Sequence, residues 1–147
     1  SAGSLAVQEK IDQGTASLAL GTSAGILQAR DQFAVAVSLA TSTTGATTAQ
    51  LDTARYFWAL TRAAALASDL APSNSLESLG GFLSGFGYDA AARTSLSTLQ
   101  RPATFPSTSP TGSDVRTFLQ GRARQELTGA LATLSQVSDD FRVSWTD

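Results

Sequence analysis

Apolar side chains recur every three to four residues along most of the chain, and they never alternate in the period-two pattern of a strand. Residues 5–20 carry leucine, isoleucine and alanine at near-helical spacing, and Gly21 then offers the left-handed conformation that ends many helices. Ser23 is placed to cap a second helix that has Phe33 on its apolar stripe. Because about three residues join the two helices, the sequence predicts an antiparallel helical hairpin.

A third helix follows the small polar loop of residues 41–48. Thr47 and Gln50 are three residues apart, which is the spacing of a capping box. We therefore expect this helix to begin near Ala49 and to run to about Leu70.

The next stretch predicts short helices and a connector. Asn74 and Glu77 suggest a capped helix start, Gly87 would end that helix, and Asp89 would cap the next one. Three prolines then punctuate residues 101–112, which are expected to form an extended connector.

The last element has the clearest periodicity. Ser113 is expected to cap an amphipathic helix of about 28 residues, on the order of 40 Å long. Its apolar positions are Val115, Phe118, Leu119, Leu127, Ala130, Leu131, Leu134, Val137 and Phe141.

Together these elements predict one all-α domain over residues 1–147, with about six helices. Antiparallel hairpins occupy residues 1–100, the Pro-rich connector residues 101–112, and the long C-terminal helix residues 113–147. A chain of 147 residues is long enough to bury a proper core without disulfides.

Three adjacent aromatic residues, Tyr56, Phe57 and Trp58, open the alanine-rich half of the third helix. Successive helical residues point about 100° apart, so the three rings sweep roughly 200° of the helix surface. Either the helix is packed on two sides, or one ring is an exposed anchor for a partner.

The hairpin resembles a tetratricopeptide unit over about residues 10–43. The resemblance rests on Ala29, Phe33 and Ala36, which reproduce the small–aromatic–small spacing of the second helix of that repeat. Ser17 falls at the small position of the first helix. The sequence as a whole is also similar to those of helical-repeat lipoproteins and extracellular proteins of anaerobic bacteria. The resemblance implies a tetratricopeptide-like array that serves protein–protein interaction or assembly, with no catalytic residues to carry over.

This hairpin departs from the tetratricopeptide pattern at two positions. Gln13 stands where a bulky apolar residue is usual, and Thr41 replaces the closing proline. A second copy of the pattern 34 residues later does not fit, so any later repeats are degenerate.

Composition excludes several classes of function. The chain has no histidine and no cysteine, which removes Ser-His and Cys-His nucleophilic systems and nearly all zinc sites, and no cofactor is implied. Ten basic residues stand against twelve acidic ones and Lys10 is the only lysine, so nucleic-acid binding is not expected. The acidic pairs Glu9/Asp12 and Asp139/Asp140 have the pattern of solvated surface charge.

Compartment is suggested by composition alone. No apolar run reaches the length of a membrane span, and the Ser/Thr-rich composition favours an exported, mature protein of the bacterial envelope or exterior.

Two functional hypotheses follow. The first is a non-enzymatic structural protein that assembles with itself or with another protein into an oligomer or filament, because a surface of low charge resists association weakly. The second is a monomeric module that binds a peptide or small ligand in a pocket lined by Tyr56, Trp58 or Phe33. The candidate interface residues are Tyr56, Phe57, Trp58, Phe105, Arg116 and Arg122.

Overall fold

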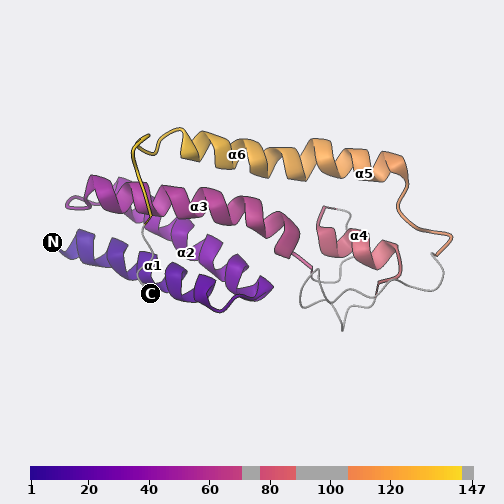
Figure 1. Cartoon of the computed structure of the whole chain (residues 1–147), viewed down its shortest axis with the longest axis horizontal. Coiled ribbons are helices and arrows are strands. Elements are labelled where there is room, and N and C mark those ends of the chain that lie inside the picture. Colours follow the sequence, from indigo (N-terminus) through magenta and orange to yellow (C-terminus); the bar gives the residue numbers. More distant parts are fainter. Residues whose placement is uncertain (71–76, 89–105, 144–147) are drawn as a thin grey trace.

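The computed structural model describes residues 1–70, 77–88 and 106–143, and every regular element among them is helical (Figure 1). The all-α class is therefore confirmed. The elements are α1 (Ala2–Ala19), α2 (Ser23–Ser42), α3 (Thr48–Ser68), α4 (Leu79–Gly85), α5 (Gly112–Phe118), a π-helical segment (Leu119–Ala123) and α6 (Arg124–Leu134).

Helices α5 and α6 and the π segment between them form one continuous helix, so the described part of the chain holds five helices. The predicted helix that Asp89 would cap lies outside the described residues, as do Asn74 and Phe105.

The helices form an open row in sequence order. Helix α2 packs between α1 and α3, and α3 packs between α2 and α6, so that α1 and α6 lie at the two edges (Figure 1). Helices α1 and α3 also touch each other, less extensively. Helix α4 lies beyond the C-terminal end of α3, under α5.

The hairpin forms as predicted, with one correction at its cap. Gly21 has a φ of 64°, the left-handed conformation expected of it. The cap of α2 is Thr22 rather than Ser23: its backbone is extended, and its hydroxyl accepts the N–H of Gly25. Ser23 is already the first helical residue.

The core of the row is centred on two stacked rings. Phe33 of α2 is fully buried and stacks on Phe57 of α3 with 5.1 Å between ring centroids. Val7 and Ile11 of α1 complete the cluster. Gly14 of α1 lies directly against the Phe33 ring, which allows α1 and α2 to approach closely.

The start of α3 confirms the predicted capping box. The Thr47 hydroxyl accepts the N–H of Gln50, and the Gln50 side chain accepts the N–H of Thr47. The same Gln50 amide donates to the carbonyl of Ser4 at 3.0 Å, so the cap also ties α3 to α1. The helix begins at Thr48 and ends at Ser68, two residues before the predicted end.

Helix α4 starts later than predicted. Its cap is Ser78, whose hydroxyl accepts the N–H of Gly81, and Glu77 lies outside the helix. Gly87, with a φ of 86°, follows its end as expected.

The last helix both starts and ends earlier than predicted. Thr111 and Asp114 form a reciprocal capping box, so Thr111 rather than Ser113 is the cap. The helix ends at Leu134, where the hydroxyl of Ser135 turns back onto the carbonyl of Ala132.

The residues after α6 return to the start of α3. The Ser138 hydroxyl donates to the buried Asp52 carboxylate at 2.6 Å, and the Phe141 ring lies 5.5 Å from that of Tyr56. Val143 packs against the core cluster. The apolar residues at positions 137 and 141 therefore belong to this returning segment and not to the predicted long helix.

Candidate interaction interface

The aromatic triplet is engaged within the chain. Phe57 is 5% exposed, and the partly buried Tyr56 packs edge-on against it at 5.3 Å. Trp58, also partly buried, lies under the guanidinium of Arg62, 5.1 Å from the ring centroid. The three rings thus occupy different sides of α3, as expected for a helix that is packed on two sides.

The arginines of the last helix differ in their partners. Arg122 lies 4.0 Å from Glu126, four residues further along the same helix. Glu126 has a closer partner, Arg62 of α3, at 3.0 Å, and both of these side chains are only about one-fifth exposed. Arg116 is exposed and has no ion pair among the described residues. The Arg62–Glu126 pair, 64 residues apart in sequence, left no signal in any local pattern.

The apolar residues of the last helix divide between two faces. The side turned to α3 buries small side chains, Ala130 and Thr133. Gly129 lies directly beneath the Arg62 guanidinium. Five large residues are left in solvent, with exposed fractions of 37% for Val115, 56% for Leu119, 51% for Leu127, 69% for Leu131 and 40% for Leu134.

The π segment aligns the two halves of this helix. A π turn holds one extra residue, so the eight steps from Phe118 to Glu126 rotate the chain as about seven α-helical steps would, close to two full turns. Phe118 therefore faces the same side as Glu126, and its ring packs on Phe82 of α4 at 4.9 Å. Leu119 is brought into line with Leu127 in the same way.

Helix α3 adds Leu60, which is 50% exposed, to this surface. Leu60 directly follows the buried Ala59, and Leu131 directly follows the buried Ala130. Helices α3 and α6 are antiparallel, and a local twofold axis relates two such helices. The residue that directly follows a contact residue therefore points to the same side of the helix pair on both helices. We call this surface the leucine face. It comprises Leu60, Val115, Leu119, Leu127, Leu131 and Leu134.

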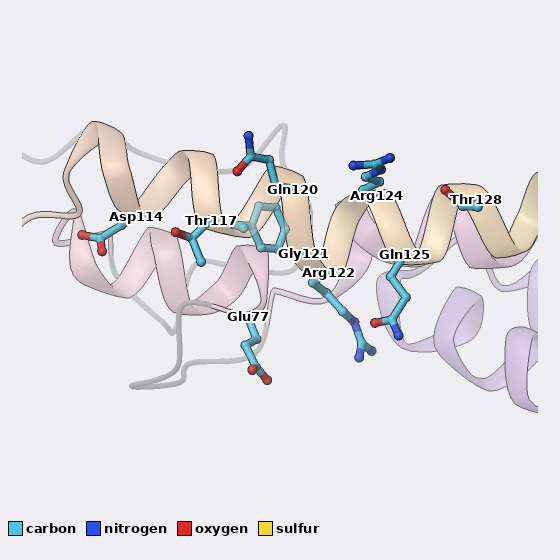
Figure 2. A pocket seen from close by; sticks show the side chains of 10 residues that line it. Glu77, Asp114, Thr117, Gln120, Gly121, Arg122, Arg124, Gln125 and Thr128 are labelled. Carbon is cyan, nitrogen blue, oxygen red and sulfur yellow. The ribbon is translucent and has the colours of Figure 1, made fainter.

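A polar groove of about 830 Å³ runs over the π segment (Figure 2). Gly121 forms its floor, since nothing lies within 4 Å of the place where a Cβ would stand. Gln120 and Arg124 project to one side of the helix, and Arg122 and Gln125 project to the other. The labelled polar side chains therefore point in different directions and not toward one common point.

The pocket expected beside the aromatic helix stays a prediction. Tyr56, Trp58 and Phe33 line neither the polar groove nor the small cavity beneath Arg62.

Neither a metal cluster nor a membrane span occurs in the described ranges. Residues 1–70, 77–88 and 106–143 hold no group of three or more acidic, histidine or cysteine side chains that could bind a metal ion. In the same part of the chain, no helix is both long and apolar enough to cross a bilayer.

Comparison with known proteins identifies no relative. No protein family matches the sequence, and neither the curated proteins nor the solved structures include a significant match to it. The function of the chain is therefore inferred from its own geometry.

Proposed function

We propose that this chain is a non-enzymatic structural protein that assembles with itself through packing of its helices. The single observation that carries the proposal is the leucine face. Five large apolar side chains line one side of the last helix over some 20 residues, on the order of 30 Å, and Leu60 of α3 widens the surface. Isolated exposed leucines are ordinary, but five large apolar residues along one side of a helix are typical of an interaction surface.

The charge distribution supports association through this surface. Residues 127–138 carry no charged side chain, so the part of the leucine face formed by Leu127, Leu131 and Leu134 is neutral along the chain. Charged residues are depleted at the centre of protein interfaces in the same way. Placement outside the cytoplasm and a tetratricopeptide-like origin of the helical row are parts of the same proposal, and they rest on composition and on the spacing around Phe33.

Light scattering across a hundredfold range of concentration tests the proposal, with electron microscopy of the same samples. We expect mass to rise with concentration. The Leu127→Gln/Leu131→Gln variant should shift that rise to higher concentration by tenfold or more, because burying one leucine contributes roughly 1.5–3 kcal/mol. Val35→Gln, at a 43% exposed position on α2, is the matched control and should leave assembly unchanged. A wild-type chain that stays monomeric throughout would refute self-assembly.

The polar groove supports a second candidate function, that of a monomeric module for a peptide or small polar ligand. Its floor at Gly121 is open, and Thr117, Gln125 and Thr128 offer hydrogen-bonding groups along it. A ligand at 100 times its dissociation constant would stabilise the fold by about 2.7 kcal/mol. A screen of short peptides by thermal unfolding should find such stabilisation, and Gly121→Trp, which fills the groove, should abolish it. Equal stabilisation of both proteins would place the ligand elsewhere.

A further inference from the structure

The outer face of α1 is a second surface that the fold leaves uncovered. Leu5 and Leu20 are 72% and 63% exposed, and they lie at the two ends of this face. Between them Glu9, Asp12 and Ala16 are also exposed and follow at steps of four and three residues. This spacing places all five on one side of the helix, opposite the side that packs on α2.

The two acidic residues of α1 have no basic partner in the described part of the chain. The Glu9 carboxylate accepts a hydrogen bond from the amide of Gln13 at 3.2 Å, and Asp12 accepts one from Gln8 at 3.0 Å. Neither takes part in an ion pair. An apolar face with a negative centre thus lies at one edge of the helical row.

The leucine face, at the other edge, carries the opposite charge along its margin. Arg116 follows Val115 by one position and lies about 100° around the helix from it. Arg124 precedes Leu127 by three positions and Leu131 by seven, so it lies about 60° from the first and about 20° from the second, beside the stripe. Both arginines are exposed, and within residues 1–70, 77–88 and 106–143 neither has an acidic partner. The two edges are therefore complementary in charge, and both are apolar.

The leucine face also has the position that a further helix of the row would take. A helix seated on it would touch α6 and, through Leu60, α3. Helix α3 itself packs in the same manner on α2 and, less extensively, on α1. Successive helices of the row alternate in direction, so the added helix would run antiparallel to α6.

We propose that α1 of a second copy of this chain occupies the leucine face. An antiparallel register that sets Glu9 opposite Arg124 is consistent with the apolar positions of both surfaces. In this register Leu5 lies within one residue of the level of Leu127, and Leu20 reaches the first turn of α5. Along the helix axis Asp12 then lies at a level between Arg124 and Arg116, so each acidic residue lies near an arginine.

Such a contact joins two different surfaces, so it is heterologous. Each added copy presents a fresh α1 face and a fresh leucine face, and the contact therefore propagates into a ring or an open filament rather than stopping at a dimer. This inference rests on the proposed self-assembly and specifies its partner surface and its polarity.

Charge reversal on each face tests the inference. The variant Glu9→Arg/Asp12→Arg makes the α1 face basic, and the variant Arg116→Glu/Arg124→Glu makes the last helix acidic. Each variant alone sets like charges against each other, and we expect its assembly to need at least tenfold more protein at low salt. Raising the salt to about 1 M should shrink this difference, because the charges are then screened within about 3 Å.

Mixing the two variants gives the decisive measurement. Each reversed face then meets a reversed face of the opposite sign, and each unchanged face meets an unchanged one, so a 1:1 mixture should assemble as the wild type does. This rescue also shows that both variants are folded. Asp139→Arg/Asp140→Arg makes the same change of charge at two exposed residues that belong to neither face, and this variant should assemble normally on its own.

The outcomes separate this inference from the proposed function. If Leu127→Gln/Leu131→Gln blocks assembly while neither charge reversal affects it, α1 is not the partner surface and the inference is overturned, although self-assembly stands. If the 1:1 mixture of the two charge-reversed variants does not assemble, the inference about α1 is likewise overturned. A wild-type chain that never associates overturns both.

Discussion

Replacing Gly14 by alanine should destabilise the fold, although alanine is the better helix former. A Cβ at this position would lie 2.7–2.9 Å from three atoms of the Phe33 ring, Cζ, Cε2 and Cε1. Carbon atoms in contact prefer about 3.5–4.0 Å, so the ring would have to move by nearly 1 Å. Phe33 is fully buried and stacked on Phe57, which leaves it little room to move.

The magnitude follows from two opposing effects. Gly→Ala in a helix interior gains up to about 1 kcal/mol from backbone propensity. Overpacking of a tight core costs about 1–3 kcal/mol. We expect the cost to win at Gly14, with a net loss of about 1–2 kcal/mol in the free energy of unfolding.

Gly121 provides the matched control for this substitution. It also lies inside a helix, but no atom is within 4 Å of the place where its Cβ would stand, so Gly121→Ala should gain stability by up to about 1 kcal/mol. Urea unfolding followed by circular dichroism, at a concentration below the onset of assembly, measures both changes as shifts in midpoint at constant slope. Equal stabilisation by the two substitutions would refute the reasoning, because it would mean that the Phe33 ring yields at no cost.

Three further predictions concern contacts that fix the helical row. A double-mutant cycle on Arg62→Met and Glu126→Gln should give a coupling of about 1–2 kcal/mol in urea unfolding, since both side chains are about four-fifths buried; a value near zero would make this pair an ordinary surface salt bridge. Ser138→Ala should cost about 1.5–3 kcal/mol, because it leaves the buried Asp52 carboxylate without its hydroxyl donor, and hydrogen exchange should show faster opening of the segment after α6. Thr47→Ala should cost about 1 kcal/mol in thermal unfolding, whereas Thr47→Ser should keep most of the stability; equal losses would mean that the capping hydroxyl is not what matters.

The parts of the fold that could be predicted from the sequence depend on signals within a few residues. Gly21 and Gly87 both adopt the positive φ expected of helix-ending glycines, and the Thr47–Gln50 capping box forms as predicted. The predicted cap of α2 is wrong by one residue because two hydroxyl residues are adjacent there. The choice between them depends on the backbone that leaves Gly21, and a local pattern does not contain that information.

The predicted length of the last helix is wrong because periodicity does not say which neighbour covers a face. The helical spacing of apolar residues continues through Val137 and Phe141 and so predicts a longer helix. The helix stops at Leu134, however, and the segment that follows it returns to α3. Arg62, which pairs with Glu126 of this helix, lies on α3, 64 residues away in the sequence. Contacts of this range cannot be found from spacing alone.

The orientation of that helix is a further reason to propose that a partner covers the leucine face. Burial of a leucine contributes roughly 1.5–3 kcal/mol, so burial within one chain alone would favour turning the leucines toward α3. The helix instead buries Ala130 and Thr133, and the Arg62–Glu126 ion pair joins the same side of it to α3. An ion pair specifies geometry better than it stabilises a fold. On the proposed self-assembly, burial of these leucines is left to a second copy of the chain, and the arginines beside them favour the acidic face of its α1.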